Sequence, residues 1–85
     1  MQYLIMCRSL TNAQKALAFL ERKGISAAII KAPQGLNTSG CAYALSLYRR
    51  FEEASRLLRN NNMLSGKRYM RYQNGEFVEV SDDLS

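Results

Sequence analysis

The residue of this 85-residue chain best suited to covalent chemistry is Cys41, which follows a polar loop and begins an apolar segment. A thiol in such a place can be exposed and still be held by a rigid element. Lys31, Arg49 and Arg50 lie near it in the sequence, and a cation within a few ångströms would favour the thiolate over the thiol, whose ordinary pKa is about 8.5. The residues alone leave a second interpretation open, in which Cys41 is a small, buried apolar side chain.

The composition argues against several other kinds of site. The chain has no histidine, the commonest general base and transition-metal ligand in proteins. Its two cysteines, Cys7 and Cys41, are too few for a structural zinc site, which needs four ligands. We therefore expect no metal and no cofactor, and either thiol chemistry or binding remains as the activity.

The charge of the chain favours an anionic partner. Twelve Lys and Arg residues against seven Asp and Glu give a formal net charge of +5. Arg49 and Arg50 stand at the start of a predicted helix, where the helix dipole disfavours cations. Such a misfit predicts a site for an anion or an acidic partner, although both side chains could equally extend into solvent. The 67–72 segment alternates bases and aromatics, as a platform for single-stranded nucleic acid or a charged edge strand would.

The length and hydropathy indicate one small domain. We expect a single α+β domain over residues 1–80 and a polar tail over 81–85. The sequence contains no apolar run near the roughly 20 residues that span a bilayer, so we expect no membrane association. The apolar Tyr3–Cys7 run is too short for a signal-peptide core. We therefore expect a cytoplasmic protein.

Apolar periodicity and turn residues predict seven elements. They are strands over Gln2–Arg8, Ile25–Lys31 and Cys41–Tyr48, helices over about 10–23 and Arg50–Asn60, and final strands over Lys67–Gln73 and Glu76–Val80. Ser9 or Thr11 is expected to cap the first helix and Gly24 to end it. This order predicts a ferredoxin-like β-α-β-β-α-β sandwich with a C-terminal β-hairpin.

Two details of this fold bear on partners and pairing. Asn74-Gly75 predicts a two-residue type I′ turn, which places Tyr72 opposite Phe77 and Arg71 opposite Val78. The first strand is apolar on both sides, whereas helices cover only one face of such a sheet. Leu4 and Met6 would then lie on an uncovered face that could form a homodimer, unless the terminal hairpin covers it.

Two segments of the sequence resemble a known family. They are YLIMCRSLTNAQKALAFLERKGI and PQGLNTSGCAYALSL, and together they are similar to the Se/S carrier-like family of small bacterial proteins over about residues 3–48. Pro33 matches a proline of the family's loop and Cys41 matches its cysteine. Ala44-Leu45 follows at the family's spacing.

The resemblance implies that Cys41 accepts sulfur or selenium as a persulfide-type adduct from a cysteine desulfurase-like donor and passes it to an acceptor protein. The loop containing Pro33, Gly35 and Gly40 would present the thiol, with the two glycines supplying the freedom to do so. Lys31, Arg49 and Arg50 would lower its pKa or dock an acidic donor. This implies a carrier rather than an enzyme.

The competing hypothesis is a binding module without thiol chemistry. In it, the basic ferredoxin-like domain would use Arg49, Arg50 and the 67–71 segment to bind nucleic acid or an acidic protein. Substituting Cys41 separates the two hypotheses, because carriage requires the thiol and binding does not.

Overall fold

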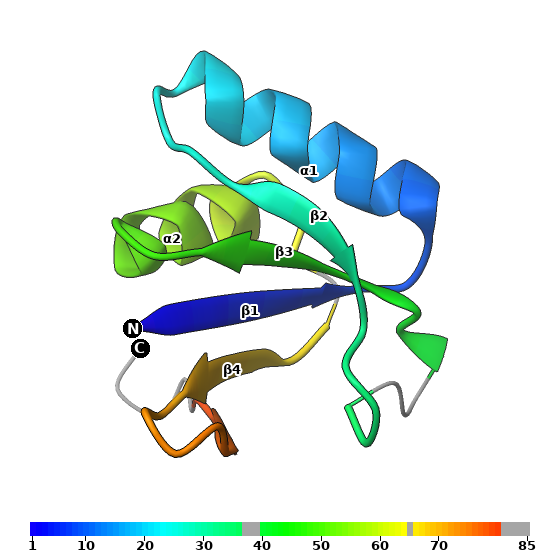
Figure 1. The fold of residues 1–85 in the computed structure, drawn as a ribbon. Coiled ribbons are helices and arrows are strands. Elements are labelled where there is room, and N and C mark those ends of the chain that lie inside the picture. Colours follow the sequence, from blue (N-terminus) through cyan, green and yellow to red (C-terminus); the bar gives the residue numbers. More distant parts are fainter. Residues whose placement is uncertain (37–39, 65, 81–85) are drawn as a thin grey trace.

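The computed structural model of the chain (Figure 1) describes residues 1–36, 40–64 and 66–80. The predicted polar tail, 81–85, lies outside these described residues. The elements are β1 (Gln2–Cys7), α1 (Leu10–Arg22), β2 (Ala28–Lys31), β3 (Tyr43–Leu47), α2 (Phe51–Asn60), β4 (Arg68–Arg71) and β5 (Phe77–Glu79). Neither helix has the length and apolar character of a membrane span within this described part.

The strands form one five-stranded sheet in the order β2-β3-β1-β4-β5. Every neighbouring pair is antiparallel, and β1 lies at the centre between β3 and β4. The helix α1 joins β1 to β2, and β3 lies between these two strands (Figure 1). The fold is therefore α+β, and its strand order is compatible with the predicted ferredoxin-like arrangement.

Helix α1 begins and ends where the sequence indicates. The Ser9 side chain accepts a hydrogen bond from the Asn12 backbone N–H, so Ser9 is the N-cap. At the other end Gly24 has a positive φ of 78°, and the backbone N–H groups of Gly24 and Ile25 donate to the carbonyls of Glu21 and Leu20. This pair of bonds is a Schellman motif, which directs the chain from α1 toward β2.

The main core lies between the helices and one face of the sheet. It contains inward-facing residues of β1 and β3 packed against the buried sides of α1 and α2, including Ile5, Leu45, Leu20 and Leu58. Each of these four side chains is 1% exposed or less. This layer holds the two ends of β3 in fixed positions, and those ends carry the candidate functional residues.

The opposite face of the sheet is also covered. Leu4 is 0% exposed and Met6 is 2% exposed, in a second cluster with Cys41 and Ala44. Partly buried side chains from the segment after β2 and from β4 and β5 pack against this cluster. Of the two possibilities left open for Leu4 and Met6, the covered one is therefore correct, with β4 and β5 of the terminal hairpin contributing to the cover, and the premise for a dimer through those two residues is lost.

The turn between β4 and β5 differs from the predicted one. Arg71 pairs with Phe77 and Met70 with Val78, one residue away from the expected register. The Tyr72 N–H donates to the Glu76 carbonyl, which leaves three residues, 73–75, in the loop. Gly75 has a φ of 90°, whereas Asn74 is not among the described residues with positive φ. A type I′ turn needs positive φ at both central residues, so the loop takes the three-residue form with glycine in the left-handed position.

Candidate functional site

Cys41 lies just before β3 and is buried. Its exposed fraction is 5%, and its neighbours in the second cluster are apolar, among them Leu4, Met6 and Ala44. The residues on either side of it, Gly40 and Ala42, are exposed. The thiol therefore lies directly beneath the surface, and of the two interpretations left open by the sequence, the buried one is correct.

The cover over Cys41 comes from the segment that follows β2. Ala32 and Leu36 pack against its cluster, and the Leu36 N–H donates to the Pro33 carbonyl at 3.0 Å, which forms a turn. Gly35 and Gly40 have φ values of 90° and 78°, a conformation that favours glycine. The remaining loop residues, 37–39, lie outside the described residues.

The predicted cations are not gathered around Cys41. Arg49 and Arg50 follow β3, whereas Cys41 precedes it, and a strand of five residues spans about 17 Å. Lys31 is at the nearer end, paired with Tyr43, but it is exposed and alternates with Ile30, which packs in the cluster of Cys41. Proximity in sequence was misleading because β3 separates the two ends.

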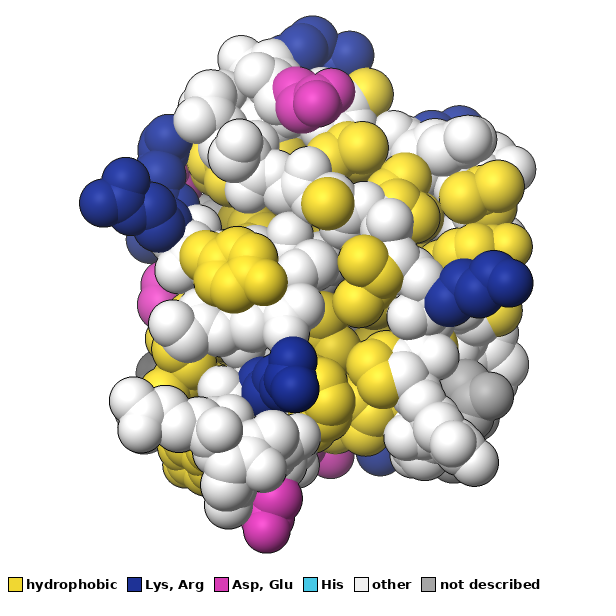
Figure 2. Space-filling view, in the orientation of Figure 1, with side chains coloured by type: hydrophobic (Ala, Val, Ile, Leu, Met, Phe, Trp, Pro, Cys, Tyr) yellow, Lys and Arg dark blue, Asp and Glu magenta, His cyan; other side chains and the backbone are white. Residues whose placement is uncertain are grey.

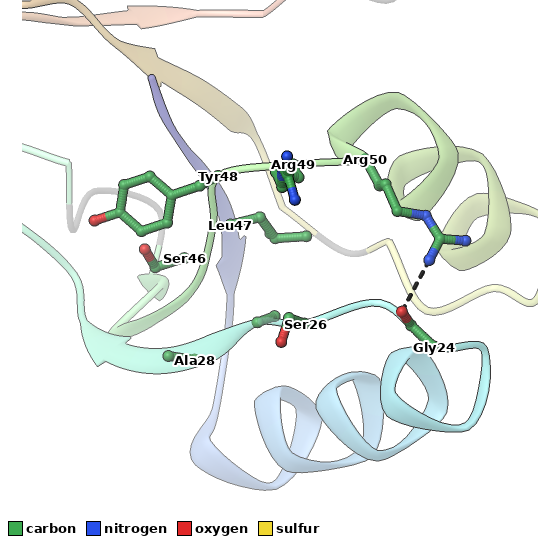
Figure 3. Close-up of a pocket in the computed structure, with 9 residues that line it drawn as sticks. Gly24, Ser26, Ala28, Ser46, Leu47, Tyr48, Arg49 and Arg50 are labelled. Atoms are coloured by element: carbon green, nitrogen blue, oxygen red, sulfur yellow. Dashed lines mark hydrogen bonds between the residues drawn. The ribbon is translucent and has the colours of Figure 1, made fainter.

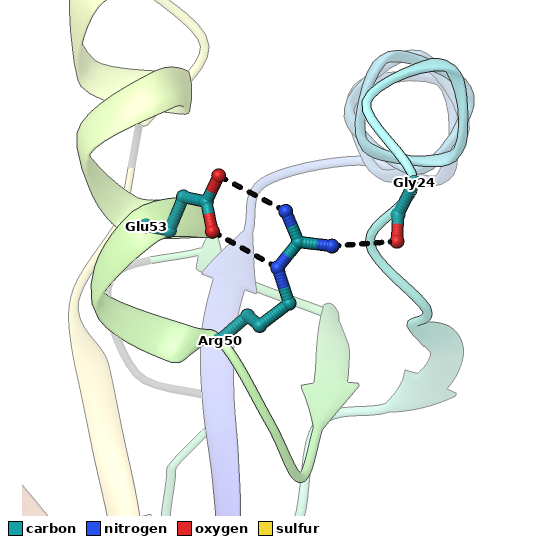
Figure 4. Close-up of polar contacts among 3 residues, drawn as sticks. All are labelled: Gly24, Arg50 and Glu53. Atoms are coloured by element: carbon teal, nitrogen blue, oxygen red, sulfur yellow. Dashed lines mark hydrogen bonds and ion pairs between the residues drawn. The ribbon is translucent and has the colours of Figure 1, made fainter.

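Arg50 makes a specific set of contacts within the chain (Figure 4). Its Nε and Nη2 atoms donate to the two carboxylate oxygens of Glu53 at 2.9 and 3.0 Å, and Nη1 donates to the Gly24 carbonyl at 2.8 Å. The hydrogen bond from Arg50 is the main cause that lowers the pKa of Glu53. Arg50 thus links the end of α1 to the start of α2.

The backbone of Arg50 is left-handed, with φ 58° and ψ 32°, a conformation that non-glycine residues rarely adopt. It is the N-cap of α2 and provides no side-chain cap. The exposed Arg49, by contrast, makes no hydrogen bond or ion pair with the described residues. Of the two arginines proposed for docking, Arg49 is the one whose guanidinium remains available.

A cavity of about 530 Å³ opens beside these arginines (Figure 3). The register between β2 and β3 ends at the pair Ala28 and Ser46, and the two segments beyond it, 24–28 and 46–50, form opposite walls. The hydrogen bond from Arg50 to Gly24 joins the walls at one end. A second hollow of about 380 Å³ is lined by Met1, Gln2, Arg71, Tyr72 and Gln73, and Tyr48 lines both cavities.

The other thiol, Cys7, is held in the central strand. Its Sγ donates to the Ile5 carbonyl at 3.6 Å, and its side chain packs in the helix-side core. Burial, and secondarily the nearby thiol of Cys41, raise the pKa of Cys7 to about 11, although a backbone hydrogen bond at Leu45 opposes this. Cys7 is therefore a protonated core residue near neutral pH. Among the described residues, no group of three Cys, Asp or Glu side chains could hold a metal ion.

The comparison with protein families gives a match. The sequence model of a family described as "Putative Se/S carrier protein-like" matches residues 2–69. The chain belongs to this family. Comparisons with curated proteins and with solved structures gave no significant match. The Se/S carrier-like match confirms the resemblance found from the sequence and extends it beyond residue 48, through α2 and into β4.

Three features of this Se/S carrier-like chain were not found from the sequence. Gly66 touches β1 so closely that an added Cβ would lie 2.5 Å from the Met6 carbonyl oxygen. Arg68 is only 4% exposed and lies over the Phe51 ring, which in turn stacks on Tyr3. Tyr48 is 65% exposed between two cavities. A lone glycine, arginine or tyrosine gives no sequence signal for such contacts, because they join segments far apart in the chain.

Proposed function

We propose that this protein carries sulfur or selenium as a persulfide-type adduct on Cys41, between a donor enzyme and an acceptor protein. Membership of the Se/S carrier-like family carries the proposal, since the matched range spans Cys41 and the loop before it. The position of the thiol adds support, because an exposed residue precedes it and another follows it. Cys7 is a poor alternative, since its raised pKa leaves about one thiolate in a thousand at pH 8.

The transfer step needs no oxidant and no histidine. The Cys41 thiolate attacks the outer sulfur of a persulfide on the donor enzyme and forms a new S–S bond. The donor's own S–S bond breaks, and its cysteine leaves as a thiolate. The outer sulfur keeps its proton, so atoms, charge and electrons balance. The same exchange, with the acceptor's thiolate as the attacking group, discharges Cys41.

The burial of Cys41 makes loading depend on movement of its cover. Ala32 and Leu36 lie on the segment 32–36, and among the described residues one backbone hydrogen bond, from the Ala32 N–H to the Ala42 carbonyl, joins this segment to another part of the chain. Opening such a segment costs much less than opening a central strand. We infer that the donor enzyme loads Cys41 when the 32–36 segment moves away, and that closure then shields the adduct from other thiols.

Intact mass after incubation with a cysteine desulfurase and cysteine tests the proposal. We expect the wild-type chain to gain one sulfur atom, about 32 Da, and to lose it on treatment with a reducing thiol. Cys7→Ser should gain the same mass, and Cys41→Ser should not. An adduct that persists in Cys41→Ser, or a folded wild-type chain that never acquires one, would exclude carriage by Cys41.

A further inference from the structure

We propose that the chain also binds single-stranded nucleic acid, on a surface formed by Tyr48, Arg49, Arg71 and Tyr72, which we term the Tyr48 surface. It lies where β3 and β4 end, across the length of β3 from Cys41. The inference goes beyond carriage and does not depend on it.

The four residues are brought together by the sheet. Because β1 is antiparallel to both β3 and β4, the ends of β3 and β4 meet on either side of the start of β1, where Gln2 pairs with Arg71 and Tyr3 with Leu47. Tyr48 lines both cavities at this end, so the two hollows adjoin at its side chain, and we refer to them together as the groove. Volumes of about 530 and 380 Å³ are within the range that accommodates small organic groups such as a nucleotide.

The charge of the groove is positive. Among the residues that the structure describes, its lining includes three arginines and no aspartate or glutamate. Arg50 is engaged by Glu53 and Gly24, so it does not count as a free cation. Arg49 has no partner among the described residues, and Arg71 is exposed, with one 3.3 Å hydrogen bond to Gln2 and its guanidinium carbon 5.7 Å from the centre of the Phe77 ring. Both guanidinium groups can therefore donate hydrogen bonds to a phosphate.

The aromatic rings of the groove are unusually accessible. Tyr48 is 65% exposed and Tyr72 is 43% exposed, whereas Tyr3 and Tyr43 pack against the core. In Figure 3 the Tyr48 ring points away from Arg50. Bases stack on such rings in proteins that bind single strands, and nearby cations follow the backbone. Both tyrosines line the same hollow, so they can receive neighbouring bases of one strand.

The combination of rings and cations identifies the occupant as a single strand. A duplex keeps its base faces stacked inside and would leave Tyr48 and Tyr72 without a role. An acidic peptide would pair with Arg49 and Arg71 but would not need exposed rings. Figure 2 shows basic side chains spread over one face of the molecule, around a band of hydrophobic ones, and the acidic side chains lie toward its margins.

Fluorescence anisotropy of a labelled oligothymidylate of about ten nucleotides tests this inference with the full chain. We expect saturable binding at low salt. Tyr48→Ala should weaken binding at least about fivefold, and Tyr48→Phe should restore it, because the phenyl ring retains the stacking surface. Arg49→Gln should weaken binding and reduce the slope of log K against log salt by about 0.7, the value for one phosphate contact on a single strand.

Arg8→Gln is the matched control, because it removes the same charge at the far end of β1. It should retain the wild-type salt slope, and Cys41→Ser should bind like the wild type. Equal losses in Arg8→Gln and Arg49→Gln would overturn the proposal, as would unchanged binding by Tyr48→Ala. Equally tight binding of a duplex or of polyglutamate would also overturn it.

A second measurement does not depend on any variant. Amide chemical shifts of the wild-type chain, titrated with the same oligonucleotide, should change at residues 46–50 and 71–73. Changes confined to other parts of the chain would exclude the Tyr48 surface as the binding site.

Discussion

The Arg50 guanidinium and the Glu53 carboxylate are joined by two parallel hydrogen bonds, although Arg50 has a left-handed backbone that disfavours any side chain. The same guanidinium donates to the Gly24 carbonyl at 2.8 Å. These contacts join the first turn of α2 to the end of α1, and they hold the walls of the larger cavity at a fixed separation. They also explain how an arginine is retained where glycine would be favoured.

Substitutions at Arg50 separate the side-chain contacts from the backbone strain. Arg50→Ala loses all three hydrogen bonds but keeps a Cβ in the left-handed conformation. Arg50→Gly loses the same bonds and removes the strain. We expect Tm to fall more in Arg50→Ala than in Arg50→Gly, and Arg49→Ala to leave Tm unchanged. A lower Tm for Arg50→Gly than for Arg50→Ala would contradict this account.

The ion pair also predicts a small dependence of stability on pH. Arg50 lowers the pKa of Glu53 in the folded state, so the pair stabilises the fold above the unfolded pKa of Glu53. This contribution is lost as the pH falls through the lower, folded value. Urea unfolding at pH 6 and pH 3 should therefore show a smaller stability loss in Glu53→Gln than in the wild type. Because both side chains are exposed, salt should reduce the difference.

The cover of Cys41 predicts how fast its thiol reacts. In Leu36→Ala we expect Cys41 to be labelled by a thiol reagent severalfold faster, because the smaller side chain packs less well over its cluster. Leu57→Ala is the matched control, since Leu57 is also partly buried but packs against the helix-side core. The rates are measured in a Cys7→Ser background. Equal acceleration in both variants would indicate global unfolding rather than movement of the 32–36 segment.

The raised pKa of Cys7 predicts that the fold loses stability at high pH. Burial raises its pKa from 9.0 to about 11 in the folded chain, so the folded state holds this proton more tightly than the unfolded state does. The resulting stabilisation is complete below pH 9 and is lost as the pH rises toward 11. Between pH 9 and pH 11, the free energy of unfolding should therefore fall more in the wild type than in Cys7→Ala. Parallel curves for the two chains would contradict the raised pKa.

The close approach of Gly66 to β1 predicts that replacing this glycine lowers the stability of the fold. An alanine Cβ there would lie 2.5 Å from the carbonyl oxygen of Met6, and relief requires movement of the β1 backbone. We expect Gly66→Ala to reduce the free energy of unfolding by about 2–3 kcal/mol. Gly40→Ala is the comparison, because its added Cβ meets open space and only its positive φ opposes the change, at a cost of about 1 kcal/mol. A Gly66→Ala variant as stable as Gly40→Ala would contradict the close approach.

The sequence predicted those elements whose signals are local. Ser9 and Gly24 are capping residues with short-range geometry, so the start and end of α1 were found from spacing alone. The turn at Asn74-Gly75 was located correctly, but its type was not. An Asn-Gly pair occurs in both two-residue and three-residue hairpin loops. The loop length is settled by the strand register, in which Arg71 pairs with Phe77.

The candidate site was harder to predict because its relationships are not local. Cys41 and Arg50 are nine positions apart, yet β3 places them at opposite ends of the sheet. The burial of Cys41 depends on Leu36, Tyr69 and Phe77, which come from three separate segments. Tyr48 and Tyr72 line the same hollow only because β1 separates the strands that carry them.

The two sulfur atoms pack on opposite faces of the sheet, Cys7 with the helices and Cys41 beneath the segment after β2. The chain contains no third cysteine. A reaction within the chain, in which one thiol attacks the persulfide of the other, would require both side chains to reach one face of the sheet. Under the proposed function, a loaded molecule would therefore not discharge itself, and the lifetime of its persulfide would be set by how soon an outside thiol arrives.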